Sequence, residues 1–300
     1  MNITQPSESL VELAQNFFFL SVMMELCEEV DLTQVEGEIA LLEKYRRTLQ
    51  QQEKEDIVSK AVDLAYEHLP VGKRDFRIPQ KLDKVLSRLQ NCNIIVPVEE
   101  GLYRFRHEQL LFYFYALGAI EKAESISEML TRVAGCYVEM ALVWVLRIFY
   151  YRRSQRLTTF LETALGQESP LSFYEKAALI DEIAMWTDPG SHQGAVTTIV
   201  EIISKDRSLE SYFFRHLAEE KNLAWFDPLK RLGIFDVAPT PETSGQIWSP
   251  ILYLGGIVPQ YSKQVTDVAA QLETQNLNVM YELLRVTGQM PPTEVVQMIP

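Results

Sequence analysis

His107 stands at a position in the chain where a side chain could contact a phosphate group. A predicted strand, Leu102–Arg106, passes directly into a predicted apolar helix that runs from His107 to about Lys122. The first turn of a helix has free N–H groups and the positive end of the helix dipole, which together favour anions. His107 is therefore a candidate phosphate contact. The alternative is that it has a purely structural role.

Basic residues gather just before His107. The stretch from 73 to 106 holds eight basic and four acidic residues, a local charge of +4 in a chain whose net charge is −13. A predicted helix and the strand before His107 carry the residues that could contact nucleic-acid phosphates: Lys81, Lys84, Arg88 and Arg104. The alternative is that these are ordinary solvated charges, because this helix lacks the Asn, Gln and Ser cluster that favours contacts with base edges.

The sequence contains no motif for catalysis or metal binding. Gly72–Lys73 lacks the upstream glycine and the following Ser or Thr of a Walker A loop, and neither HExxH nor G-x-S-x-G occurs. The other histidines have no partners at ligand spacing: His68, His192 and His216. We therefore expect no catalytic site and no metal site in this chain.

The composition is that of a folded protein. Its 300 residues, 47% apolar and 23% charged, suit two domains or one elongated helical array. The net charge of −13 should repel nucleic acid and anionic membranes unless a local basic face overrides it.

Several features predict a cytoplasmic protein with no membrane partner. Residues 1–9 are polar, without the basic start of a signal peptide, and the longest apolar stretch, Met140–Tyr151, is short and interrupted by Arg147. The three cysteines are scattered and form no CxxC pair: Cys27, Cys92 and Cys136. We expect them to be reduced, buried thiols.

The segment before His107 predicts a helix followed by a tight hairpin. Pro79 suits the first turn of a helix that continues to Gln90, with apolar residues at three- and four-residue steps. The predicted strands and the turn between them are Ile94–Val98, Leu102–Arg106 and Glu99-Glu100-Gly101. A helix followed directly by a hairpin is the signature of a winged-helix unit, which we expect at residues 71–122.

Residues 1–70 predict a helical lead-in. A capping box at Ser9 opens the first helix, and one face of it is expected to be buried: Leu10, Leu13, Phe17, Leu20, Met24 and Cys27. The second predicted helix is Val35–Gln52. Arg46 and Arg47 are expected to face outward, and four apolar residues are expected to face inward: Ile39, Leu42, Tyr45 and Leu49. A third helix is predicted at Glu55–His68. A chain that starts with a buried helix usually lacks the partner that covers it.

Residues 123–300 predict antiparallel helix pairs and no strand. The predicted helices are Ile126–Ala134, Tyr137–Arg152, Arg156–Leu165, Ser172–Trp186, Ala195–Ser204, Ser208–Glu220, Trp225–Leu232, Ile247–Leu254, Tyr261–Leu272, Leu277–Val286 and Thr293–Ile299. Pro or Gly at the corners, without strict repetition, indicates an irregular HEAT-like α-solenoid, so the fold class is mostly α. The last helix has no polar capping repeat, and we expect both ends of the chain to be cut.

Phe105-Arg106-His107 leads into a helix that carries Phe112-Tyr113-Phe114-Tyr115-Ala116. This block resembles the winged-helix region of STAND-class P-loop NTPases of the NACHT kind, in which aromatic-x-His precedes Glu-aromatic-aromatic-Ala-Ala. Ala14–Leu20 is similar to the helical segment after the nucleotide-binding core of that family, with Phe17 in place of a proline. Trp225–Leu229 is similar to the helical repeats of bacterial STAND proteins, many of which act in defence against phage.

The resemblance implies that His107 is a sensor histidine that faces the β-phosphate of ADP in the resting state. The chain has no Walker A or Walker B core, so we expect that it is not an enzyme. We expect ADP or ATP as a cofactor only when an ATPase core is supplied. A full-length relative would be an ATPase.

Our hypothesis is a non-catalytic regulatory and scaffold portion of a STAND-like signalling ATPase that acts through protein–protein contacts. Residues 1–70 would follow the missing core, 71–122 would form the winged helix, and 123–300 would present a surface to a protein partner. The alternative is a winged-helix DNA-binding regulator with a helical effector domain.

Overall fold

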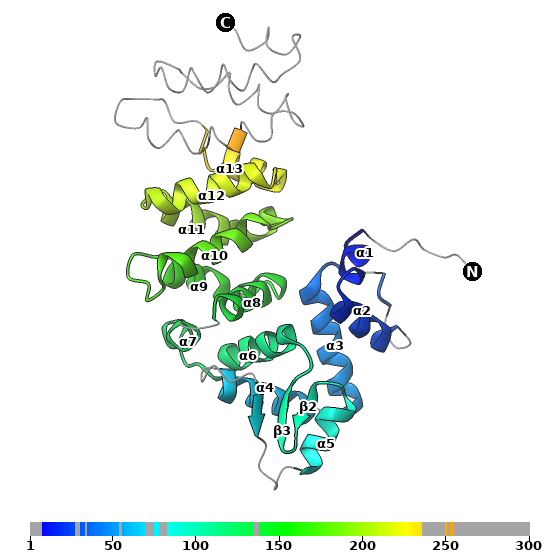
Figure 1. Cartoon of the computed structure of the whole chain (residues 1–300). Helices are drawn as coiled ribbons and strands as arrows, with labels where there is room; N and C mark the ends of the chain where they lie inside the picture. The colour runs from blue at the N-terminus through cyan, green and yellow to red at the C-terminus, as the bar shows by residue number, and fades with distance from the viewer. Residues whose placement is uncertain are drawn as a thin grey trace, which may run out of the picture. The chain divides into compact units, whose positions relative to one another are not determined.

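The computed structural model describes residues 8–27, 31–33, 35–53, 56–69, 75–77, 83–134, 138–235, 250 and 253–254. The described chain is mostly helical, with one small antiparallel sheet of three strands, which confirms the predicted fold class at this level (Figure 1). The chain divides into two compact units, residues 1–154 and 155–300. The predicted divisions after residues 70 and 122 stay predictions.

The first unit is built around one buried helix. Its described helices are α1 (Glu8–Ala14), α2 (Phe17–Leu26), α3 (Glu38–Glu53), α4 (Asp56–His68), α5 (Asp83–Asn91), α6 (Glu108–Lys122), α7 (Ile126–Val133) and α8 (Val138–Tyr151). Helix α6 packs against α4, α7 and α8, and Figure 1 shows it between α4 and α8. Every residue from Leu110 to Ala119 is buried, because a helix covered on all sides needs an almost continuous apolar sequence.

The sheet has the order β1-β3-β2 and consists of β1 (Asp75–Arg77), β2 (Ile95–Glu99) and β3 (Leu102–Phe105). The β2–β3 hairpin lies where the sequence predicts it, and Gly101 adopts the positive φ of +73° that its turn requires. Strand β1 was not predicted; it pairs with β3 so that Phe76 lies opposite Tyr103. Pro79, the predicted start of the helix before the hairpin, lies outside the described residues.

The predicted first helix is two helices. Asn16 interrupts it and caps α2, because its side-chain oxygen accepts a hydrogen bond from the N–H of Phe18 at 2.9 Å. The break resets the helical phase, so the predicted buried face is wrong at three positions. Phe17 is 88% and Met24 67% exposed, and Cys27 is also exposed. The residues of α2 that are buried instead are Phe18, Phe19, Val22, Met23 and Leu26.

The remaining cysteine and helix-face predictions have mixed outcomes. Cys92 is half-buried, and Cys136 lies outside the described residues. The predicted inward residues of α3 are all buried, and Arg47 is exposed as predicted. Arg46 is not turned outward, because it is half-buried beside Glu43.

The described helices of the second unit form two rows. They are α9 (Arg156–Leu165), α10 (Phe173–Ala184), α11 (Gln193–Ile203), α12 (Arg207–Glu219) and α13 (Phe226–Arg231). Helix α9 packs on α11, and α10 packs on α12. Apart from residues 250, 253 and 254, the helices predicted from Ile247 onward lie outside the described residues. None of the described helices is long and apolar enough to cross a membrane.

Helices α4 and α6 approach each other closely at Gly118. A Cβ atom on Gly118 would lie 3.0 Å from the Cβ atom of Tyr66. The Tyr66 ring has cations near it, with Lys122 Nζ 4.8 Å and the guanidinium carbon of Arg132 4.7 Å from its centroid. It also stacks against Tyr115. The ring and the backbone that carries it therefore have little freedom to move away.

We predict that Gly118→Ala lowers the free energy of unfolding by about 1–3 kcal/mol, because the added methyl group pushes α4 and α6 apart. Gly194→Ala is the matched control, since its Cβ would meet only Thr158 Oγ1 at 3.7 Å. The control should leave stability unchanged or raise it slightly through better helix propensity. Thermal unfolding followed by circular dichroism compares the two, and equal melting temperatures would contradict the prediction.

Candidate functional site

The structure places His107 at the N-cap position of α6, directly after β3 and Arg106. Its Nδ1 atom accepts a hydrogen bond from the N–H of Gln109 at 3.3 Å. The imidazole ring stacks on the Phe18 ring of α2, with 4.2 Å between centroids and 9° between planes. Burial lowers the pKa of His107 below its ordinary value of 6.5; Glu108 opposes this shift and Arg106 adds to it. His107 is therefore held in its neutral form near pH 7.

A hollow of about 500 Å³ opens beside this histidine. Side chains of α2, of the turn before it and of the β3–α6 junction line it: Gln15, Asn16, Phe17, Phe18, Ser21, Arg106 and His107. The lining combines a guanidinium group, amides, a hydroxyl group and an imidazole with two aromatic rings. These donors could hold an anionic group, and the rings could cover an apolar or planar part of the same ligand.

Arg106 joins α2 to the β3–α6 junction. Its Nη1 atom pairs with Glu25 of α2, and its guanidinium carbon lies 5.8 Å from the Phe18 centroid. The Nε and Nη2 atoms of Arg106 are buried and have no hydrogen-bond partner among the described residues. In the sequence, Arg106 stands out only as part of the local basic excess between residues 73 and 106. Its position next to His107 was the signal that could have identified it.

The described residues that were predicted to contact nucleic acid lie on two different elements, α5 and β3. Lys84 is exposed and Arg88 half-buried on α5, one turn apart, whereas Lys81 lies outside the described residues. Arg104 lies on β3, where its Nε atom pairs with Asp75 Oδ1 of β1 at 3.0 Å. Glu99, the last residue of β2, and Glu100, in the hairpin turn, are exposed and would repel phosphates.

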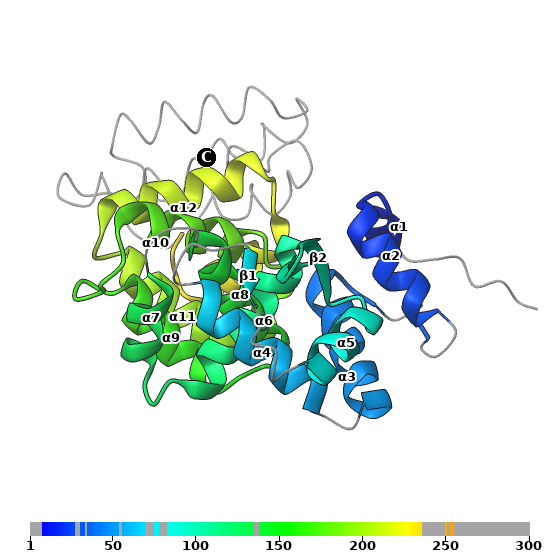
Figure 2. The ribbon, with the colours of Figure 1, turned by 60° about the horizontal axis from the view of Figure 1, so that its bottom comes forward.

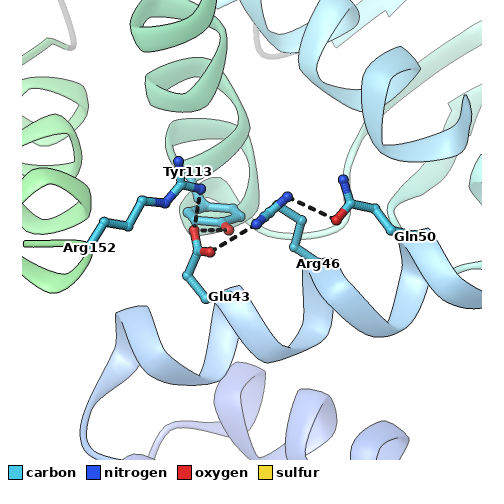
Figure 3. Close-up of polar contacts among 5 residues, drawn as sticks. All are labelled: Glu43, Arg46, Gln50, Tyr113 and Arg152. Carbon is cyan, nitrogen blue, oxygen red and sulfur yellow. Dashed lines mark hydrogen bonds and ion pairs between the residues drawn. The ribbon is translucent and has the colours of Figure 1, made fainter. Parts of the chain in front are cut away.

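Among the described residues of the first unit, Glu43 of α3 is the most buried charged group. Its Oε1 atom accepts hydrogen bonds from Tyr113 Oη of α6 at 2.9 Å and from Arg152 at 2.7 Å. Its Oε2 atom accepts one from Arg46 at 3.1 Å, and Arg46 also donates to Gln50 at 2.9 Å (Figure 3). No pattern in the sequence predicts this cluster, because its members are up to 109 residues apart.

This arrangement suits a structural role for Glu43. Burial raises the pKa of its carboxyl, but the hydrogen bond and charge of Arg152, together with Arg46 and Tyr113, outweigh burial, and the pKa lies below its usual value. A carboxylate that is ionised at neutral pH and hydrogen-bonded at both oxygens is a poor general base. Glu43 instead joins α3, α6 and the end of α8.

A second buried carboxyl group, Glu210, lies on α12 in the second unit. Burial raises its pKa to about 7, against a smaller opposing effect of Arg207. Elsewhere in this unit, Lys176 Nζ of α10 donates to the carbonyl oxygens of Leu165 and Gly166 at the end of α9. Glu210 gave no sequence signal, because one Glu in an amphipathic helix resembles a solvated charge.

We predict that Glu43→Gln lowers the free energy of unfolding by about 3 kcal/mol at neutral pH, because it leaves two arginines without their counter-charge. The pKa of Glu43 is lowered on folding, so its stabilisation is present above the unfolded value of 4.5 and is lost as pH falls below it. The difference between wild type and variant should therefore shrink in acid. Urea unfolding across this pH range measures it.

The matched control for Glu43→Gln is Glu38→Gln. Glu38 Oε2 pairs with Arg147 at 2.7 Å, but both side chains are about one-third exposed. Loss of this pair should cost less than about 1 kcal/mol. Equal losses in the two variants, or a loss for Glu43→Gln that does not depend on pH, would refute the structural role given to Glu43.

We predict that NMR titration gives His107 a pKa below 6.5 and that Phe18→Ala raises it toward 6.5, because water then reaches the imidazole ring. Val11→Ala, at an exposed position of α1, should leave the value unchanged. The spectrum of His107→Asn assigns the resonance. A pKa that does not respond to Phe18→Ala would show that burial by Phe18 is not the cause.

The described residues contain no group of three or more His, Cys, Asp or Glu side chains that could hold a metal ion. Comparison of the chain with protein-family models and with curated proteins finds no match. The role of the His107 site is therefore inferred from its geometry.

Proposed function

We propose that this chain is a non-catalytic regulatory and scaffold portion of a STAND-like signalling ATPase in the cytoplasm, acting through protein–protein contacts. The observation that carries the proposal is the position of His107. It caps α6 beside Arg106 and lines a hollow of about 500 Å³. The hollow is where an ATPase core would bring the phosphates of its nucleotide.

The local chemistry supports contact with a phosphate. Because Nδ1 of His107 accepts the Gln109 N–H, the neutral ring carries its proton on Nε2 and can donate it to a phosphate oxygen. Arg106 retains two donor atoms without partners among the described residues. The N-terminus of α6 adds the favourable end of its dipole. In this proposal the site senses a nucleotide that the core binds.

The fold supports the rest of the proposal. Helix α5 followed by the β2–β3 hairpin, with β1 completing the sheet, supports a winged-helix unit. The two helix rows of the second unit support a HEAT-like α-solenoid, which is suited to binding a protein partner. The DNA-binding alternative has weaker support, because Arg104 is paired with Asp75 and the hairpin turn is acidic.

We predict that the purified chain does not hydrolyse ATP and that, immobilised in an extract of its source cells, it retains a P-loop ATPase in an ADP-dependent way. His107→Asn keeps a residue that can cap the helix but removes the imidazole. It should reduce this retention about tenfold, which is the effect of losing one hydrogen bond to the phosphate. Mass spectrometry of the retained proteins and an assay of bound ADP give the result.

Lys84→Glu is the control for this experiment, because Lys84 is exposed on α5 and has no place in nucleotide sensing. It should leave retention unchanged. Clear ATP turnover by the pure chain would refute the proposal. Salt-sensitive binding to duplex DNA that Lys84→Glu abolishes would favour the DNA-binding alternative instead.

A further inference from the structure

We propose that the outer face of α1 and α2 binds an amphipathic helix of a partner protein whose flanks are rich in Lys and Arg. We define the outer face as Val11, Phe17, Leu20 and Met24. Val11 is 48%, Phe17 88% and Met24 67% exposed, and Leu20 is half-buried. Phe17 also lines the hollow beside His107, whereas Val11, Leu20 and Met24 do not, and the peptide binding proposed here needs no nucleotide.

Helix geometry aligns the three of these side chains that lie on α2. Phe17, Leu20 and Met24 are three, four and seven residues apart, so they form one stripe along α2. The opposite side of α2 packs into the first unit through Phe18, Phe19, Val22, Met23 and Leu26. Figure 2 shows α1 and α2 side by side at the edge of this unit. Large apolar side chains aligned on an exposed helix face mark an interaction surface rather than scattered surface residues.

The charge of this region selects the partner. Residues 1–43 contain nine acidic residues and no Lys, Arg or His. Arginines from other elements pair with three of them: Glu25, Glu38 and Glu43. Of the other six, Asp31 lies near Lys44, whose Nζ donates to the Asp31 carbonyl oxygen at 2.7 Å. The remaining five have no basic residue within their own segment: Glu8, Glu12, Glu28, Glu29 and Glu36. A partner with cationic flanks would gain complementary charge here.

The same charge disfavours the other occupants of an apolar face. Two copies of this acidic segment would repel each other in a symmetric dimer, and an anionic membrane surface would repel it too. A helix fits the shape of the stripe, because helix pairs pack through side chains at three- and four-residue spacing. Met24 is an unbranched side chain that adapts to the contours of a helix placed against it.

The test uses a fluorescent amphipathic peptide with a Leu stripe and Lys-rich flanks, and the same peptide with Glu-rich flanks. The Lys-flanked peptide should bind the full chain, and the double variant Phe17→Ala/Met24→Ala should weaken binding at least about tenfold. Raising salt from about 0.05 to about 0.5 M should weaken binding as well. Both replaced residues are exposed, and circular dichroism checks that the variant stays folded.

The matched control is Phe173→Ala/Met185→Ala, which removes two exposed apolar side chains of the second unit, 46% and 51% exposed. It should leave the affinity unchanged, as should His107→Asn, so that this inference and the nucleotide proposal can fail separately. Equal binding of both peptides, or equal loss in the control, would overturn the inference. A dimer that Phe17→Ala/Met24→Ala dissociates, or binding to phosphatidylserine vesicles, would also overturn it.

Discussion

A single buried carboxylate, Glu43, fixes how three helices of the first unit lie. It accepts hydrogen bonds from Tyr113 of α6, from Arg152 after α8 and from Arg46 of its own helix. Burying an ionised carboxylate is unfavourable unless each oxygen finds donors, so these partners must meet at one point. The close approach of Gly118 to Tyr66 and the hydrogen bond from Tyr115 to the Arg132 carbonyl also orient α6. Together with these contacts, the hydrogen bond from Tyr113 to Glu43 sets the rotation of α6.

That rotation also positions the candidate site. Tyr113 lies less than two turns after His107 on the same helix, so the orientation of α6 decides where its N-terminus and His107 face. Helix α2 is then held against this end by the stack of Phe18 on His107 and by the ion pair of Arg106 with Glu25. The hollow lies beside these contacts and shares their residues. A ligand or partner that acts on the hollow would therefore act on the attachment of α2.

The predictions that depend on local pattern were largely right. The helices between residues 107 and 232 and the β2–β3 hairpin lie close to their predicted places, because helical periodicity and a turn glycine are local signals. Strand β1 was missed because Asp75-Phe76-Arg77 is too short and too polar to show a strand pattern without its partner β3. The break at Asn16 was missed because an apolar run hid an N-cap residue, although Asn is a strong capping signal.

The sequence by itself determined the mostly helical class, the place of the hairpin and the position of His107 at the start of α6. Each of these follows from residues within a few positions of one another. Only the tertiary structure decided which charges are buried together and which apolar side chains stay exposed. Glu43 and Tyr113 are 70 residues apart and Glu25 and Arg106 are 81 apart. Such pairs form because helix packing brings side chains from distant parts of the chain together, and no spacing in the chain encodes that approach.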